Sequence, residues 1–283
     1  MSFLTLYLQL LIFSIGPLLC MGLLLCFLRN LFARLVGTHA GRPLLLAFFA
    51  PGSPLREAAH VLAAVLCFQR VEEVRFLDLN APDGELGFTE RSYHPRNYLA
   101  RFGNFLYALA PAALGLVVVL GVFLVCFGGV MESFFLLLSS LEEIDSVFGY
   151  LRIAVGILPA MFAYGEVSLV AKIVGALLLL FLCMGIFVSL GELLDGTFGL
   201  IVYAVLMAVP AGVLLLLDAR MQRAAMQAMR AFATGVIALY IPVLLAAAVL
   251  LVFGALFFLV RKLGAVPPDS RAVEPYRGGE EEK

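Results

Sequence analysis

The stretch FGNFLYALAPAALGLVVVLGVFLVCFG, residues 102–128, decides the fold class of this chain. It contains no Asp, Glu, Lys or Arg. About 20 consecutive apolar residues are enough to cross the hydrocarbon core of a bilayer as a helix. A soluble domain rarely needs so long an uncharged run. We therefore predict that residues 102–128 form a transmembrane helix.

Other apolar runs lie on both sides of this stretch. Three of them are equally clear, at residues 3–28, 168–190 and 231–260. Two are weaker, namely 197–217, which begins with polar residues, and 146–165, which Arg152 and Pro159 interrupt. Together these runs predict an all-α polytopic membrane protein with about six transmembrane helices.

The composition of the whole chain agrees with a membrane protein. Of the 283 residues, 63% are hydrophobic and 14% are charged, whereas soluble domains are about 45–50% apolar and about 25% charged. The formal net charge is -1 and the basic residues are scattered, so we expect the lipid bilayer and no nucleic acid as a partner. We predict one membrane domain over residues 1–263 and a disordered charged tail at 264–283.

The apolar run at 44–69 is broken by proline. The break is Pro51-Gly52-Ser53-Pro54, and proline ends one helix but suits the first turn of the next. We therefore expect a short apolar segment at 44–50 and a helix at 54–69. This broken or re-entrant segment need not cross the membrane in full.

Two short β-prone runs follow between residues 70 and 98. They flank the turn signal Asn80-Ala81-Pro82-Asp83-Gly84, which predicts a small β-hairpin. Lipid does not tolerate open strand edges. The hairpin must therefore lie at the membrane interface, in a soluble loop, or against protein.

Basic residues predict which loops face the cytoplasm. Those that follow the first apolar run are Arg29, Arg34 and Arg42, and those that precede the last are Arg220, Arg223 and Arg230. Basic loops tend to stay cytoplasmic. This rule places the N-terminus outside and both 29–42 and 219–230 inside.

The helix expected after the proline break carries Arg56-Glu57-Ala58-Ala59-His60. In an HExxH zinc site, histidines at i and i+4 bind the metal from one helix face and the glutamate acts as general base. Here Arg56 occupies the first histidine position, and arginine cannot ligate zinc because it stays protonated. The pattern also occurs at the start of ordinary helices, where glutamate favours the positive end of the dipole. An ionisable cluster in an apolar segment of a membrane protein nevertheless marks a candidate functional site.

Two further segments are of interest. Glu192-Leu193-Leu194-Asp195-Gly196 separates two apolar runs. It is either a solvated loop or a means of bringing a carboxylate to a site between helices. Ala110-Pro111 lies inside the 102–128 run, where proline predicts a packing kink.

Taken in this order, the segments resemble the site-2 protease family of intramembrane metalloproteases. In that family an HExxH helix is followed by a short β-element, a helix with a Gly-Pro-x-x-Asn-like segment, and a later Leu-Asp-Gly. The corresponding segments here are Arg56–His60, the 70–90 hairpin, Ala110-Pro111 and Leu194-Asp195-Gly196. The resemblance covers about residues 44–200. The stretch from about 50 to 115 is also similar to bacterial membrane proteins, so we expect a multi-pass protein of a bacterial inner membrane.

The resemblance implies roles for individual residues. Glu57 matches the general base, His60 one zinc ligand and Asp195 the distal ligand. Arg56 replaces the other zinc histidine, so the set is one ligand short of the usual three. His94, just past the hairpin, could supply the third ligand. Alternatively, Arg56 pairs with Glu57 or Asp195 and replaces the missing cation in a salt-bridged structural node.

Three functions follow from these alternatives. The favoured hypothesis is a degenerate site-2-protease-like core that has no peptidase activity and no cofactor and that binds or scaffolds another membrane protein or peptide. The second is an active intramembrane zinc metallopeptidase with altered ligands. The third is a transporter or channel component in which Arg56, Glu57, His60 and Asp195 line a polar path, as ionisable residues do in proton relays.

Overall fold

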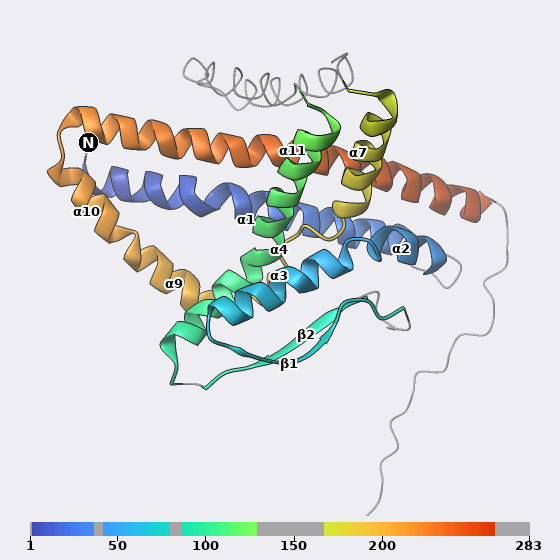
Figure 1. Ribbon diagram of the computed structural model, residues 1–283, viewed down its shortest axis with the longest axis horizontal. Helices are drawn as coiled ribbons and strands as arrows, with labels where there is room; N and C mark the ends of the chain where they lie inside the picture. The colour runs from blue at the N-terminus through green and yellow to red at the C-terminus, as the bar shows by residue number, and fades with distance from the viewer. Residues whose placement is uncertain (1, 37–41, 80–85, 95, 129–166, 264–283) are drawn as a thin grey trace, which may run out of the picture.

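The computed structural model describes residues 2–36, 42–79, 86–94, 96–128 and 167–263. In chain order the elements are α1 (Phe3–Val36), α2 (Arg42–Phe49), α3 (Ser53–Leu66), β1 (Arg70–Arg75), β2 (Phe88–Ser92), α4 (Tyr98–Cys126), α7 (Leu169–Leu182), α8 (Leu190–Asp195), α9 (Thr197–Leu206), α10 (Ala208–Leu216) and α11 (Ala219–Leu263). Figure 1 shows the long helices α1 and α11 side by side and the two strands outside α3.

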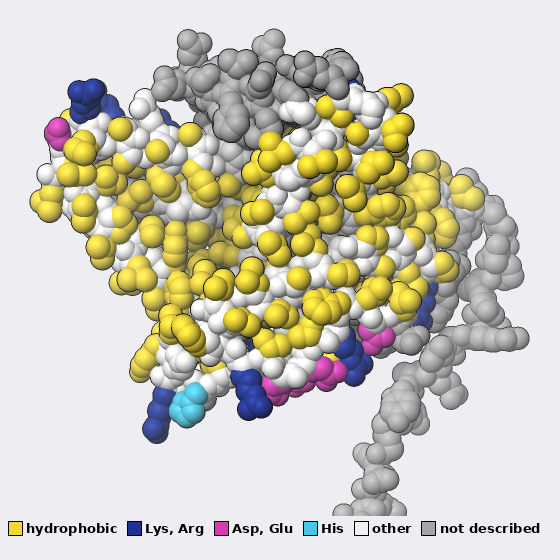
Figure 2. All heavy atoms as spheres, in the orientation of Figure 1, with side chains coloured by type: hydrophobic (Ala, Val, Ile, Leu, Met, Phe, Trp, Pro, Cys, Tyr) yellow, Lys and Arg dark blue, Asp and Glu magenta, His cyan; other side chains and the backbone are white. Residues whose placement is uncertain are grey.

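Four of the described helical segments are long and apolar enough to cross a membrane. They are α1, α4, the consecutive pair α9–α10 and α11. Hydrophobic side chains cover most of the visible surface, whereas charged side chains gather along the edge that carries the strands (Figure 2). By length and composition these are the helices of a membrane protein. The weaker run at 146–165 and the tail at 264–283 lie outside the described residues, so the expected total of about six spans stays a prediction.

The predicted transmembrane helix at 168–190 is wrong. α7 is only 14 residues long and ends at Leu182, and residues 183–189 before α8 are not helical. This linker, Cys-Met-Gly-Ile-Phe-Val-Ser, carries no charge and is mostly apolar, which is why hydropathy does not detect the break. Its buried members are Cys183, Met184, Gly185, Ile186, Phe187 and Val188. Non-helical backbone at membrane depth is tolerated where protein covers it, so neighbouring elements must enclose the linker.

Glycines on neighbouring elements make room for the 183–189 linker. They are Gly22 in α1, Gly52 before α3 and Gly115 in α4. The backbones come closest at Gly52, where an added Cβ would lie 2.8 Å from the backbone nitrogen of Gly185. The N–H of Val188 also donates to the carbonyl oxygen of Gly22 at 3.2 Å. The linker is thus held by close backbone contacts instead of by a helix of its own.

The proline break and the hairpin are confirmed. α3 begins at Ser53, with Pro54 in its first turn. β1 and β2 pair antiparallel, with Val74 opposite Thr89. The turn expected at 80–84 lies outside the described residues. Contacts with α3 from both strands place the hairpin on the outer side of that helix.

α1 and α11 run in the same direction. Leu6 near the start of α1 shares a packed cluster with Met226 near the start of α11, and Phe32 near the end of α1 lies beside Gly254 (Figure 1). Residues 219–230 therefore lie at the N-terminal end of α1. The predicted topology, which separated these two ends, is wrong. The charges of single loops could not reveal that these two ends lie together, because they carry no information about which helices are neighbours.

Candidate functional site

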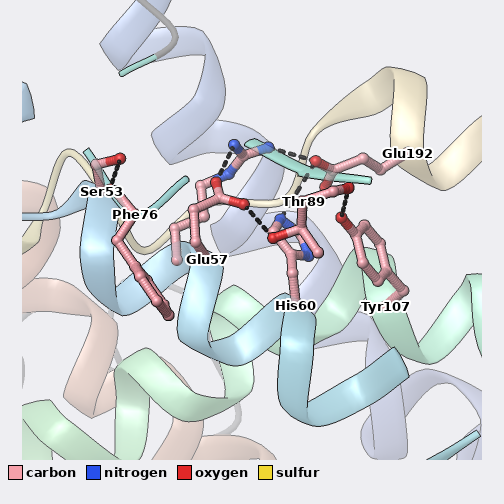
Figure 3. Close-up of polar contacts among 8 residues, drawn as sticks. Ser53, Glu57, His60, Phe76, Thr89, Tyr107 and Glu192 are labelled. Carbon is pink, nitrogen blue, oxygen red and sulfur yellow. Dashed lines mark hydrogen bonds and ion pairs between the residues drawn. The ribbon is translucent and has the colours of Figure 1, made fainter. Parts of the chain in front are cut away.

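α3 carries Glu57 and His60 on its buried face. Each residue is only 1% exposed, and their i, i+3 spacing puts them on one side of the helix. Ala64, one turn beyond His60, and the adjoining Ala59 and Ala63 are also buried, which lets α3 pack on α4. Polar groups buried this deeply need partners. The partners come from α8, β2 and α4 (Figure 3).

Arg56 links two carboxylates. Its Nη1 donates to Glu57 Oε1 at 3.2 Å, and its Nη2 donates to Oε1 of Glu192 in α8. The guanidinium also lies over the ring of Phe187, 4.9 Å from the ring centroid. The side chains of Arg56 and Glu192 are 14% and 20% exposed. The expected ion pair with Glu57 is therefore present, and the second carboxylate comes from Glu192 instead of Asp195.

His60 is stacked on Tyr107 of α4. The ring centroids are 4.0 Å apart and the ring planes differ by 19°. The Nε2 atom lies 3.4 Å from Glu192 Oε1, the oxygen that also accepts from Arg56. Neither ring nitrogen makes a hydrogen bond within the described part of the chain. His60 is thus held by stacking and by a neighbouring carboxylate, with unused hydrogen-bonding capacity.

Strand β2 covers this cluster from outside. The hydroxyl of Thr89 donates to Glu57 Oε2 at 2.7 Å, and the carbonyl oxygen of Thr89 accepts from the Tyr107 hydroxyl at 3.4 Å. Past the end of β1, the carbonyl oxygen of Phe76 accepts from the Ser53 hydroxyl at 3.0 Å. Figure 3 shows both connections between the hairpin and α3. The hairpin therefore closes the outer side of the Glu57 carboxylate.

A second polar network anchors the hairpin on α4. The guanidinium of Arg91 in β2 lies over the Tyr107 ring, 3.7 Å from its centroid. Its Nη1 donates to Gln69 Oε1 at 2.8 Å and to Asn104 Oδ1 at 2.6 Å. Since Tyr107 also stacks on His60, a continuous series of contacts runs from the hairpin to α3.

Two predicted site residues lie apart from the cluster. Asp195 is exposed at the end of α8. His94 is exposed after β2, where its Nδ1 accepts from the N–H of Arg96 at 3.2 Å. Within the described ranges, no group of three or more His, Cys, Asp or Glu residues is placed to hold a metal ion. Of the predicted set, the fold brings together Arg56, Glu57 and His60.

Four residues of the cluster were missed by the sequence analysis as site residues. They are Thr89, Arg91, Tyr107 and Glu192. Glu192 precedes Asp195 by about one helical turn, so local sequence did not distinguish the two carboxylates. Tyr107 carried the best signal, because a phenol within the apolar run 102–128 needs a polar partner. Thr89 and Arg91 sit in an ordinary strand pattern that offers no such signal.

The pKa of Glu192 is lowered from its ordinary value of 4.5. Burial is the largest single influence on this carboxyl and would raise the pKa. The contact with His60 and the charge of Arg56 are the largest of the influences that act in the opposite direction, and the net effect is a lowered pKa. The charge of Arg91 adds to the lowering. Glu192 is therefore ionised at neutral pH, with both Arg56 and His60 beside its Oε1.

We expect this carboxylate to make the fold sensitive to acid. Its folded-state pKa lies below that of the unfolded chain, so ionised Glu192 stabilises the fold above pH 4.5, and this contribution is lost as the pH falls through the lowered value. Unfolding free energies of the wild type and Glu192→Gln should differ most near neutral pH and converge below pH 4.5. A difference that does not change with pH would contradict this account.

The charges of the cluster balance. The guanidinium groups of Arg56 and Arg91 offset the carboxylates of Glu57 and Glu192 when His60 is neutral.

Comparisons of the chain with protein-family models, curated proteins and solved structures gave no match. The resemblance to the site-2 protease family is therefore carried by the segment order of this chain alone.

Proposed function

We propose that this chain is a multi-pass membrane protein with a degenerate site-2-protease-like core, without peptidase activity, that binds another membrane protein or peptide. The position of Arg56 carries the proposal. Its guanidinium occupies the helix position of the missing zinc histidine and pairs with both Glu57 and Glu192. Buried carboxylates need a cation, and here a side chain supplies the charge that a metal ion would supply in an active member of the family.

The surroundings of Glu57 support the loss of peptidase activity. Its Oε1 accepts from Arg56 and its Oε2 accepts from Thr89. A general base must lie within hydrogen-bond reach of the water that it deprotonates. Each oxygen of Glu57 already accepts one hydrogen bond, and the residue is only 1% exposed, so little room is left for a water beside this carboxylate. On this view the cluster serves to hold α3, α8 and the hairpin in one arrangement.

The segment after β1 supports a binding role. Phe76, Leu77 and Leu79 are 48%, 45% and 52% exposed, and the Ser53 hydrogen bond to Phe76 ties this segment to α3. Exposed apolar side chains rimmed by polar groups are typical of protein and membrane interaction sites. The neighbouring hairpin lies along the charged edge of the molecule (Figure 2). A membrane protein or peptide at the interface has the matching chemistry.

The activity half of the proposal is tested by zinc analysis and cleavage. We expect the full chain, purified in detergent, to contain far less than one zinc per molecule and to show no peptide cleavage that depends on Glu57. Stoichiometric zinc that is lost in His60→Ala but kept in His94→Ala, a matched exposed control, would overturn it. So would cleavage that Glu57→Gln abolishes.

The binding half is tested by a photo-crosslinking residue at position 76. We expect one discrete adduct with a membrane protein or peptide in native membranes, and none from position 117, where Val117 of α4 is 64% exposed in an apolar surface. Adducts of equal yield and pattern at both positions would count against a binding surface at the hairpin.

An active zinc metallopeptidase with altered ligands is the second candidate. The observation that favours it is the buried His60, whose two ring nitrogens have no hydrogen-bond partner within the described residues. A neutral imidazole with a free nitrogen is a good zinc ligand. The same zinc and cleavage measurements decide between the two candidates.

A further inference from the structure

The turn that follows α3 places a phenylalanine where glycine is usual. The N–H of Gln69 donates to the carbonyl oxygen of Ala64 at 2.9 Å, and the N–H of Phe68 donates to that of Val65 at 3.1 Å. These two hydrogen bonds form a Schellman motif, in which the residue at the position of Phe68 has left-handed backbone and is usually glycine. Phe68 has a φ of 55°, and it is the one non-glycine residue with positive φ in the described part of the chain.

Packing does not explain why the turn carries Phe68. A bulky residue is strained in the left-handed region, yet Phe68 is 74% exposed. The turn itself is held firmly, because the Gln69 side chain donates to the carbonyl oxygen of Ala100 at 2.6 Å. Strained residues gather at functional sites and ligand contacts. The fold thus presents an aromatic ring outward from a fixed turn, which points to a binding partner outside the described structure.

The turn and the start of α4 form one corner of the molecule, the α3–α4 corner, made of residues 66–72 and 92–101. Tyr98 and Leu99 are exposed here as well. The uncharged apolar run of α4 starts just after them, so the corner lies where the chain enters the membrane. Tyrosine and other amphipathic rings are enriched at that depth. The exposed apolar side chains of the corner therefore lie at the level of the lipid headgroups.

Arginines flank these apolar side chains. Arg70 at the start of β1 and Arg96 before α4 are exposed, and the guanidinium of Arg101 lies over an aromatic ring of α9. None of the three forms an ion pair with the described residues. The one acidic residue in the sequence of the corner is Glu72. Figure 2 shows basic side chains at this corner, at the lower left, below a hydrophobic surface. Positive charge is therefore in excess beside the exposed rings.

We propose that the α3–α4 corner anchors the hairpin in the headgroup layer of an anionic bilayer. Phe68 and Tyr98 enter the upper acyl chains, and the arginines bind the lipid phosphates. Guanidinium groups bind phosphate through charge-assisted hydrogen bonds, and basic residues beside a membrane span are attracted to anionic lipids. The corner lies at the opposite end of β1 from Phe76. This role does not rest on the proposed function, because it holds whether or not a protein partner binds at Phe76.

The test uses a tryptophan as a local probe of lipid. The chain contains no tryptophan, so Phe68→Trp supplies a single fluorophore in place of an exposed ring. The full chain is reconstituted in bilayers of phosphatidylglycerol and phosphatidylcholine in equal parts, of which only one carries brominated acyl chains. Bromine quenches tryptophan on contact, so the ratio of the two quenching effects reports which lipid lies at position 68. We expect phosphatidylglycerol to be favoured about fivefold or more, because each basic residue near an anionic surface contributes about that factor.

The charge requirement is tested in the same Phe68→Trp background. Arg70→Gln should lower the preference for phosphatidylglycerol about fivefold. Arg75→Gln is the matched control, because it removes the same charge from the other end of the same strand, where Glu73 and Asp78 already offset it. It should leave the preference within about twofold. Both arginines are exposed, so both variants should fold.

Three results would overturn the assignment. No quenching by either brominated lipid would mean that the ring at position 68 stays in water. Equal quenching by the two lipids would mean apolar contact without recognition of charge. Equal loss in Arg70→Gln and Arg75→Gln would mean attraction by the net charge of the hairpin instead of by the corner. Crosslinking from position 76 reports separately on the proposed function, because it measures a protein or peptide adduct at the other end of β1.

Discussion

Gly185→Ala is expected to destabilise the fold by about 3 kcal/mol or more. An added Cβ would meet the carbonyl oxygen of Gly52 and would lie 2.8 Å from the Gly52 Cα. Both are backbone atoms that cannot rotate away. To relieve the contact, either the 183–189 linker or the α2–α3 junction must move. That movement would also displace α8 and with it the Glu192 carboxylate.

The measurement is the unfolding free energy in mixed micelles, by reversible titration with SDS. Gly212→Ala in α10 is the matched control, since nothing lies within 4 Å of an added Cβ there. Alanine is the better helix former, so the control should be neutral or gain up to about 1 kcal/mol. If both variants were equally stable, the close backbone contact between Gly52 and Gly185 would not exist in solution.

Glu192→Gln is expected to cost about 3 kcal/mol of unfolding free energy at neutral pH. The change keeps the shape of the side chain but removes the charge that Arg56 and His60 share. Arg56 would be left with Glu57 alone. Breaking a buried pair costs about 3–5 kcal/mol, and we expect the lower end because the Glu192 side chain is 20% exposed.

Asp195→Asn is the control for this prediction. It makes the same chemical change about one turn later on α8, at an exposed position. Exposed substitutions of this kind usually change stability by less than about 0.5 kcal/mol. The site-2 protease resemblance alone predicts the opposite order, because it assigns the functional carboxylate to Asp195. A larger effect of Asp195→Asn would therefore indicate that Asp195, and not Glu192, is the carboxylate that lies beside Arg56 and His60.

The same titration can be repeated on Arg56→Gln in the Glu192→Gln background. The two substitutions remove partners of one ion pair, so their effects should not add. An additive double variant would mean that the two side chains do not interact. This cycle also separates the pair itself from the stacking of Arg56 on Phe187, which is lost in both backgrounds when Arg56 is replaced.

The sequence by itself determined the elements whose causes are local. The uncharged run at 102–128 is long enough to span a bilayer, and the structure contains α4 there. Pro51-Gly52-Ser53-Pro54 stops one helix and starts the next, and α3 begins within it. The β-prone runs on both sides of 80–84 pair as β1 and β2. Each depends on hydropathy or backbone chemistry within one continuous stretch of the chain.

Only the tertiary structure decided the features that depend on distant neighbours. The 183–189 linker leaves the helix because surrounding backbone accepts it, although its hydropathy continues that of α7. α1 and α11 pack side by side and run parallel, a pairing between the two ends of the described chain. Glu192, in the first turn of α8, reaches His60, whereas Asp195 at the end of the same helix is exposed. Residues three apart lie on nearly the same side of a helix, so the sequence identifies the acidic segment, and only the docking of α8 on α4 decides which carboxylate joins the cluster.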